Sequence, residues 1–132
     1  LMDKNLDGII FCPSNPYLSI DPILSINRIR KLIENQKKPR IAISPIVGHD
    51  SVKGPTSKLM KEMGVEVSSL SIAKHYKGLI DGIVIDHEDE QQAEEIREMG
   101  IEVKLSKIIV ETEEEKMRLA KESLDFIKEI GS

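Results

Sequence analysis

The sequence predicts an α/β domain in which a mainly parallel sheet is covered by helices on both faces. The first indication is that short apolar runs, such as Gly8–Cys12 and Arg40–Ser44, alternate with segments of helical periodicity. The second is that these runs are continuously apolar, which is typical of strands buried on both faces. The third is that no repeat or low-complexity linker interrupts the 132 residues, so we expect a single domain, 1–132.

The apolar runs and the helix start and stop signals give the expected order of elements along the chain. Strands are expected at Gly8–Cys12, Arg40–Ser44, Val65–Val67, Leu79–Ile85 and Ile101–Leu105. Helices are expected from about Pro22 to the Asn35–Pro39 segment, at Pro55–Met63, at Ile72–Lys77, from the acidic turn Asp86–Glu90 to Met99, and at Glu113–Ile130.

Capping residues and helical spacing assign the ends and the inner faces of these helices. N-terminal signals are Asp21 before Pro22, Ser71, and Thr112 with Glu115 three positions later, whereas Gly64 is a C-terminal signal. The expected inward residues are Ile23, Leu24, Ile26, Ile29, Leu32, Ile33, Leu59, Met60, Met63, Ala93, Ile96, Met99, Met117, Leu119, Ala120, Leu124, Ile127 and Ile130. Cys12, which ends an apolar strand, is expected to be a small core residue.

Charge and cysteine usage exclude several classes of function. The net charge of −4 argues against nucleic acid as the main partner, although a small anion can still bind to local backbone dipoles. Cys12 is the single cysteine, so the sequence predicts neither a disulfide framework nor a cysteine metal site. No apolar run approaches the ~20 residues of a membrane-spanning helix, and the N-terminus lacks a signal-peptide pattern. We therefore expect a cytoplasmic protein that does not bind a membrane.

Three neutral polar residues lie in the loop that follows the first expected strand. Ser14, Asn15 and Ser19 connect the carboxyl end of that strand to the helix that begins at Asp21. In open α/β sheets, ligands bind at this position, and anions are favoured by the free N–H groups of a helix N-terminus. The loop is therefore a candidate site for a phosphate or a nucleobase. The alternative is that its serine and asparagine side chains only satisfy local backbone groups.

The loop after the second strand is a second candidate for anion binding. Lys53 could neutralise a phosphate, and Gly48 and Gly54 would let backbone N–H groups approach it closely, with Ser44 at the start of the loop. The loop matches neither the Walker A pattern nor the dinucleotide-binding glycine pattern. The alternative is that Lys53 is a solvated surface charge. Two such loops after neighbouring strands would share one crevice.

The remaining polar residues favour structural roles. His49 and Asp50 could form an acid–base pair, but an exposed loop is favoured. Asp86, at the end of an expected strand, could bind a metal or a ribose, but a helix N-cap is favoured. Glu88–Glu90 and Glu113–Glu115 are expected to be solvated faces near helix N-termini. The three histidines have no metal-like spacing, so these residues by themselves predict no reaction.

Several motifs, in order along most of the chain, resemble those of 2-phospho-L-lactate transferase. They are Cys12–Pro16, Ser19–Leu24, Ile43–Gly48, Lys53–Pro55, Lys58–Met60 and the run from Tyr76 to Asp86. The resemblance implies a Rossmann-like fold and a role in the biosynthesis of coenzyme F-420, the deazaflavin hydride carrier of methanogens and some bacteria. It also implies a Mg²⁺-dependent transfer of a phospholactyl group from lactyl-2-diphospho-5′-guanosine to the deazaflavin Fo, with release of GMP.

The resemblance further implies roles for the two loops. Ser14, Asn15 and Ser19 would orient the diphosphate or Fo, and Ser44, Gly48, Lys53 and Gly54 would line the opposite wall near the guanosine diphosphate. The match covers only the carboxy-terminal part of the family, without its amino-terminal phosphate loop and metal-binding acidic segment. We therefore expect a fragment that is inactive by itself. Ser106–Ile109 departs from the Asp-Thr pair that is common in the family, so any role of that pair is in doubt.

Two other functions remain open from the sequence. One is a non-enzymatic regulator of the same fold that binds a nucleotide sugar. The other is a structural half-domain that forms a homodimer through an uncovered sheet edge. Both are compatible with descent from a transferase.

Overall fold

The computed structural model describes residues 6–51 and 54–131, and its centre is a parallel sheet. The strands of this sheet are β1 (Ile9–Phe11), β2 (Arg40–Ile43), β5 (Gly82–Asp86) and β6 (Glu102–Ser106), in the spatial order β1-β2-β5-β6. Neighbours in space are therefore also successive strands of this sheet along the chain. Helical segments connect them, as parallel pairing requires. This arrangement confirms the predicted α/β class with a mainly parallel sheet.

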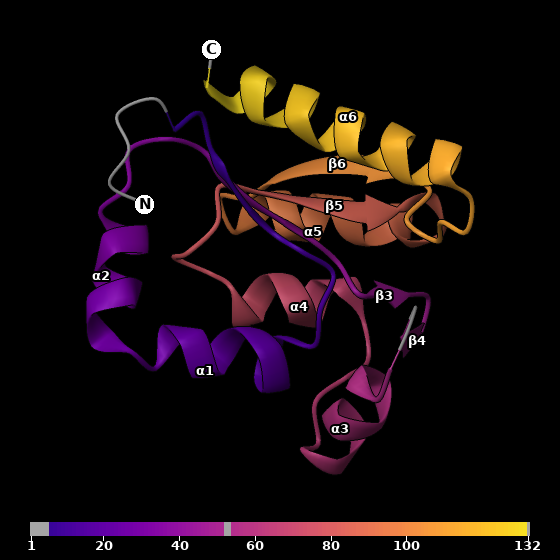
Figure 1. Cartoon of the computed structure of the whole chain (residues 1–132). Coiled ribbons are helices and arrows are strands. Elements are labelled where there is room, and N and C mark those ends of the chain that lie inside the picture. The colour runs from indigo at the N-terminus through magenta and orange to yellow at the C-terminus, as the bar shows by residue number, and fades with distance from the viewer. Residues whose placement is uncertain (1–5, 52–53, 132) are drawn as a thin grey trace.

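Helices cover both faces of the sheet and give the domain three layers. The long helix α6 (Glu113–Gly131) lies alone on one face, above β5 and β6 in Figure 1. The opposite face is covered by α1 (Asp21–Leu24), α2 (Asn27–Glu34), α4 (Ser69–His75) and α5 (Ala93–Glu98). The Rossmann-like, three-layer architecture is thus confirmed. A short hairpin of β3 (Ile46–Val47) and β4 (Asp50–Ser51), with α3 (Thr56–Glu62), lies beyond the end of β2.

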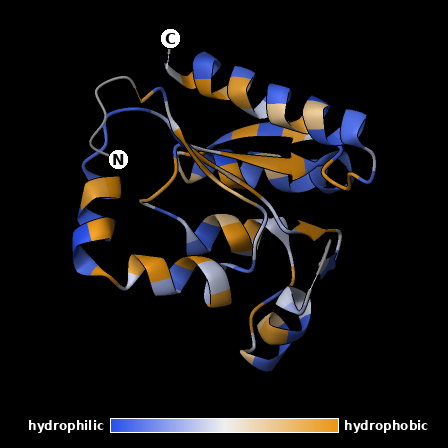
Figure 2. Cartoon of the chain, viewed as in Figure 1, coloured by the Kyte–Doolittle hydropathy of each residue, from blue (hydrophilic) through white to orange (hydrophobic). Residues whose placement is uncertain are grey.

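Two hydrophobic clusters form the core, one on each face of the sheet. Alternate residues of β2 and β5 point to opposite faces, so Ala42 and Ile83 join the larger cluster while Ile41 and Val84 join the smaller one. Figure 2 shows β5 mainly in the hydrophobic colour, as expected for a strand covered on both sides, whereas β6 alternates between hydrophilic and hydrophobic residues. The smaller cluster is completed by apolar residues of α6, namely Leu119, Phe126 and Ile127.

The segment after β1 differs from the single helix that the sequence predicts. It contains a π-helical turn η1 (Pro16–Ile20), then α1, and then α2 as a separate helix. The break occurs because Ile26 has extended torsion angles (φ −77°, ψ 102°). As a result, the helical stripe is interrupted, and Ile23 and Ile26 are exposed instead of buried.

Several other element predictions are wrong in detail. Val65–Val67 forms no strand, and α4 is capped by Ser68, whose hydroxyl accepts the Ser71 N–H at 3.1 Å, so Ser71 lies inside the first turn. The acidic turn begins as a 3₁₀ helix, η2 (His87–Gln92), before α5. The predicted inward residues Met63, Ala120, Met117 and Leu124 are exposed, as is Cys12 at the start of the first loop.

Strands β1 and β6 are the two edges of the sheet within the described residues. An unpaired strand edge is a template for pairing with another chain, so the homodimer expected from the sequence stays a prediction. None of the described helices has both the length and the apolar character needed to cross a membrane.

Candidate functional site

The carboxyl ends of the four parallel strands lie at one edge of the sheet, and both motif-bearing loops begin there. Phe11 near the end of β1 pairs with Ala42 of β2, and Ile43 at the end of β2 pairs with Val84 of β5. The loops after β1 and β2 therefore leave the sheet from neighbouring strands (Figure 1). In open α/β sheets this edge is the usual place for ligand binding.

In the first loop, Asn15 caps the π-helical turn. Its Oδ1 accepts the backbone N–H groups of Tyr17 at 2.9 Å and Leu18 at 3.1 Å. Its Nδ2 atom is buried and finds no hydrogen-bond partner within the described residues. Ser14 is half-buried and Ser19 is exposed. The local capping role is established for Asn15, while ligand binding by these three residues stays a prediction.

The second loop contains a hairpin that the sequence analysis missed. Gly48 and His49 form the two-residue turn between β3 and β4, and Gly48 has φ +64°. A positive φ at the first central residue alone is typical of a type II′ hairpin turn, which favours glycine there. In the sequence, the signal for this turn is Gly48 directly after the apolar pair Ile46-Val47. Gly54 also has positive φ (+79°) and is exposed, whereas Lys53 lies outside the described residues.

Ser44 is fully buried at the start of this loop. Its hydroxyl lies 2.7 Å from the hydroxyl of Ser69 and accepts the N–H of Ile46 at 3.1 Å. Ser69 in turn donates to the Ile46 carbonyl at 3.1 Å. These contacts join the end of β2 to the start of α4. Ser44 therefore supports the hairpin from within, and direct contact of its hydroxyl with a substrate stays a prediction.

Asp89 is the residue whose environment differs most from expectation. The acidic run Glu88–Glu90 predicts a solvated face, but Asp89 is only 1% exposed. Its Oδ1 and Oδ2 both accept the N–H of Gly48, each at 3.1 Å. Burial raises the pKa of its carboxyl, against the opposing effect of the Gly48 hydrogen bond. The torsion angles of Asp89 (φ −102°, ψ 18°) depart from helical values, and its carboxylate contacts Gly48, which no local pattern in the acidic run predicts.

Asp86 has the capping role that the sequence analysis favoured. Its Oδ2 accepts the N–H of Glu88 at 3.1 Å, which caps η2. Its Oδ1 accepts the N–H of Ile108 at 3.0 Å and so holds the segment that follows β6. Both oxygens already have backbone partners, so the structure gives Asp86 a positioning role at the sheet edge.

Another polar cluster lies at the end of β6, around Ser106. Ser106 donates a short hydrogen bond to Glu122 of α6, and Arg118 donates to the same hydroxyl at 2.9 Å. Burial raises the pKa of Glu122, but the hydrogen bonds from Ser106 and Arg118 outweigh it and leave the pKa below its ordinary value. The cluster joins α6 to the sheet edge.

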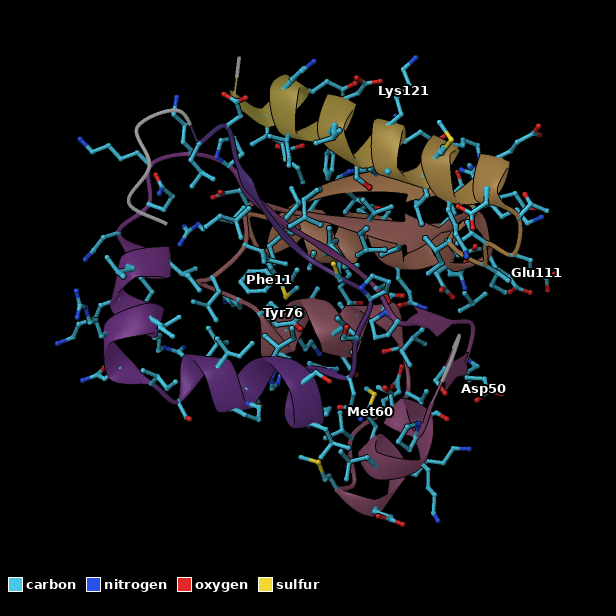
Figure 3. The ribbon with its side chains drawn as sticks, in the orientation of Figure 1. Phe11, Asp50, Met60, Tyr76, Glu111 and Lys121 are labelled. Carbon is cyan, nitrogen blue, oxygen red and sulfur yellow. The ribbon has the colours of Figure 1, made fainter. Side chains whose placement is uncertain are left out.

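His49 and Asp50 bind different neighbours instead of each other. His49 Nδ1 lies 3.0 Å from the carbonyl oxygen of Val67, whereas Asp50 Oδ1 accepts the hydroxyl of Ser57 at 3.0 Å. Figure 3 shows Asp50 at the outer margin of the hairpin. Both residues are exposed, in agreement with the exposed loop that was favoured.

The comparisons with known proteins decide the family. The model of the family described as 2-phospho-L-lactate transferase CofD matches residues 4–126. The chain belongs to the CofD family. It is 44% identical over 123 residues to the 2-phospho-L-lactate transferase of Methanocaldococcus jannaschii and 38% identical over 122 residues to that of Methanococcus maripaludis. It is also 34% identical over 125 residues to the phosphoenolpyruvate transferase of Streptomyces griseus.

These alignments cover most of this chain and a minority of each relative. The M. jannaschii alignment spans 93% of the chain and 38% of the relative, the M. maripaludis alignment 92% and 38%, and the S. griseus alignment 94% and 39%. The resemblance to the transferase family is thus confirmed. The activity, substrates and partners of a whole CofD protein are matters of proposal for this chain.

A cluster that the sequence analysis did not foresee lies under the first loop of this CofD-family chain. His75 Nε2 lies 2.8 Å from Asp21 Oδ1, and the ring of Tyr17 packs edge-on to that of His75. Tyr76 stacks on Phe11, with ring centroids 5.2 Å apart, between the sheet and the helices (Figure 3). These contacts attach the segment after β1 to α4 and so support the loop that carries Asn15.

Cavities occur away from this edge. One of about 820 Å³ lies near the amino end of β2 and the end of α6, and its lining includes Lys37, Lys38, Asp81 and Lys128. It is at the opposite end of the sheet from the motif-bearing loops, because Asp81 precedes β5 and Lys38 precedes β2. The position of the CofD motifs therefore favours the carboxyl edge as the candidate site.

Proposed function

We propose that this chain takes part in a 2-phospho-L-lactate transferase reaction of coenzyme F-420 biosynthesis. In this reaction, the hydroxyl oxygen of the deazaflavin Fo attacks the phosphorus that carries the lactyl group in lactyl-2-diphospho-5′-guanosine. A new P–O bond forms to the acceptor, the bridging P–O bond of the diphosphate breaks, and GMP leaves. The observation that carries the proposal is the 44% identity to the M. jannaschii enzyme over nearly the whole chain.

The positions of the two motif-bearing loops support a binding role at the carboxyl edge. Phosphoryl-type transfer depends mainly on alignment of the reactants and on charge neutralisation. Ser14, Asn15 and Ser19 would orient the diphosphate or Fo. In the second loop, Gly48, Lys53 and Gly54 would face the guanosine diphosphate. The buried Ser44 would support the hairpin from inside the loop. The buried Asn15 Nδ2, which has no partner among the described residues, supports a donor role in the first loop.

Mg²⁺ is part of the proposed reaction, but the described residues do not form a site for it. No group of three or more His, Cys, Asp or Glu side chains in residues 6–51 and 54–131 could hold a metal ion. Asp86, which lies at the sheet edge, already has backbone partners at both oxygens. We therefore assign no step to the metal in this chain, and propose that its ligands are substrate phosphates and other protein segments.

The acid carried by the donor is the open part of the substrate assignment. Several similar proteins are named for 2-phospho-L-lactate, but the S. griseus relative is named phosphoenolpyruvate transferase. The relatives named for 2-phospho-L-lactate are 33–44% identical to the chain and the S. griseus relative is 34% identical, so identity does not decide between the two acids. The part of the donor shared by both assignments is the guanosine diphosphate, so that part gives the more robust test.

The 132-residue chain is proposed to bind the donor without turning it over by itself. Its alignment spans 38% of the M. jannaschii enzyme, so a complete reaction site would need further segments of the family fold. The proposed partners are the small-molecule substrates and a second copy of the chain. The proposed location is the cytoplasm, whose reducing conditions suit a single exposed cysteine, Cys12.

Calorimetric titration of the chain with GDP and with UDP tests this proposal. A transferase site is expected to bind GDP at least about tenfold more tightly than UDP, which corresponds to about 1.4 kcal/mol. Tighter binding of UDP would instead support the nucleotide-sugar regulator. No binding of either nucleotide would contradict a donor site in these residues.

Two substitutions at Asn15 separate its capping role from its binding role. Asn15→Ser retains a side-chain oxygen for the cap but removes the amide donor, whereas Asn15→Ala removes both. Both variants are expected to weaken GDP binding about tenfold, and only Asn15→Ala should also lower stability by about 1 kcal/mol. Unchanged binding by Asn15→Ser would contradict the donor role.

A further inference from the structure

The carboxylate of Asp89 bridges two parts of the chain that are 41 residues apart in sequence. Both of its oxygens lie 3.1 Å from the backbone nitrogen of Gly48 in the turn of the β3–β4 hairpin. Gln92 donates to Oδ1 at 3.3 Å, and the Ser69 hydroxyl, which donates to the Ile46 carbonyl at 3.1 Å, lies 3.4 Å from Oδ2. The hairpin, η2 and the start of α4 are thus held around one buried carboxylate.

This carboxylate is held by neutral donors, and the charged groups that act on it are like charges. Asp86 and Glu88 both raise the pKa of Asp89 through like-charge repulsion. Burial of a carboxylate is costly unless its hydrogen bonds are well made. An uncharged residue of similar size would avoid the cost of removing a charge from water. The Asp89 carboxylate therefore serves mainly to bind a particular backbone group, and contributes little to the folding stability of the whole domain.

The group that it holds is the turn of the second motif-bearing loop. The hydrogen bond from the Gly48 N–H to Asp89 restrains the orientation of the hairpin relative to the carboxyl edge of the sheet. The constraint continues outward, because Asp50 of β4 accepts the Ser57 hydroxyl at 3.0 Å and Ser51 donates to the Gly54 carbonyl at 2.9 Å. Gly54 and the start of α3 are thereby placed through the hairpin.

We propose that Asp89 is a positioning residue, which holds the β3–β4 hairpin through Gly48 in the orientation that binds the nucleotide part of the donor. The proposal rests on the proposed function for its binding consequence. Asp89 itself is buried and touches no ligand; it acts through the backbone of Gly48. Asp89 and its partners Ser69 and Gln92 fall outside the motifs by which the sequence resembles the CofD family.

The test compares Asp89→Asn with Glu90→Gln, which makes the same change at an exposed neighbour in the same turn. Three quantities are measured on the 132-residue chain: hydrogen exchange of the Gly48 amide by NMR, affinity for GDP, and unfolding in urea. Asp89→Asn is expected to speed Gly48 exchange about tenfold and to weaken GDP binding about tenfold. Glu90→Gln should change each quantity less than about twofold.

Each outcome decides one part of the proposal. If hydrogen exchange of the Gly48 amide in Asp89→Asn stays within about twofold of that in the unsubstituted chain, the proposal that Asp89 holds the hairpin is overturned. Faster exchange with unchanged GDP affinity overturns its role in binding. If the unsubstituted chain binds no GDP, the proposed function fails, and Gly48 exchange still decides whether Asp89 holds the hairpin.

A second variant keeps the test decisive if Asp89→Asn does not fold. Gln92→Ala removes the donor to Oδ1 and the acceptor for the Leu70 N–H at 2.8 Å, while the carboxylate remains. It is expected to speed Gly48 exchange and weaken GDP binding by about threefold each, which converts to about 0.6 kcal/mol. Values equal to those of the unsubstituted chain would overturn the proposal.

Discussion

Gly82 lies directly against the ring of Phe126: a Cβ atom at Gly82 would come within 2.8 Å of the ring carbons Cε2 and Cζ. The same atom would lie 2.7 Å from Cδ1 of Ile130. Glycine at the first residue of β5 therefore lets α6 pack closely on the sheet. Phe126 belongs to the smaller core cluster and Ile130 packs against it, so this contact lies where α6 meets the sheet.

Substitution Gly82→Ala should destabilise the domain by about 1–3 kcal/mol, because α6 must shift or its side chains must leave their preferred rotamers. The unfolding midpoint in urea measures this. The double variant Gly82→Ala, Ile130→Ala is the control, since it removes one of the two clashing side chains. A Gly82→Ala protein as stable as the unsubstituted chain would show that α6 packs less closely than described.

Removal of the Tyr76 hydroxyl oxygen is expected to cause no loss of stability, in contrast to the addition of a methyl group at Gly82. Its hydroxyl is buried without a hydrogen-bond partner among the described residues, and burial raises its pKa. Tyr76→Phe keeps the ring that stacks on Phe11 and removes an unsatisfied polar group, so stability should be unchanged or higher by about 1 kcal/mol. Tyr76→Leu, which loses the stacked ring, should be less stable. Destabilisation by Tyr76→Phe beyond 1 kcal/mol would reveal a hidden partner for the hydroxyl.

Asp89 should make stability fall as the pH rises. Its native pKa lies above the ordinary value of 3.8, so between those two values the native state binds more protons than the unfolded state. The free energy of unfolding of the unsubstituted chain, relative to Asp89→Asn, should therefore decrease from pH 4 upward until the native pKa is passed. Urea unfolding of both proteins between pH 4 and pH 8 gives this difference. A difference that grows with pH would contradict the burial of the charged form.

The contribution of Glu122 to the free energy of unfolding should change with pH in the opposite direction. Its native pKa lies below the ordinary value of 4.5, so its stabilising contribution is present above that value and is lost as the pH falls through the native pKa. Because the side chain is about one third exposed, Glu122→Gln should cost only about 0.2–1 kcal/mol at pH 7. The cost should vanish in acid. The exposed Glu114→Gln serves as a control with no pH-dependent difference.

Much of the fold could be predicted from the sequence, because strands buried on both faces are short, continuous apolar runs. The runs at Arg40–Ser44 and Leu79–Ile85 correspond to β2 and β5, and Gly64 ends α3 with φ +73° as expected. The Thr112 cap is also present, since its hydroxyl accepts the Glu115 N–H at 3.1 Å. These features could be predicted because each depends on a single residue type that suits the local backbone, such as glycine at a positive φ or threonine at a helix N-cap.

The errors arose where tertiary contacts decide the outcome. The helical stripe through Ile23 and Ile26 was broken by an extended residue that no local signal marks. In the same way, burial of Asp89 depends on Gly48, which lies 41 residues away in sequence. Long-range hydrogen bonds of this kind leave no periodic pattern, so the buried network of the candidate site became visible only in the structure.

An NMR titration of the isotope-labelled chain with GDP tests directly whether the carboxyl edge of the sheet binds the nucleotide. We expect amide shifts to change mainly in residues 12–20, 44–51 and 54, at the carboxyl edge of the sheet. Changes confined to Lys37–Arg40 and Ile127–Gly131, around the cavity at the opposite edge, would contradict it.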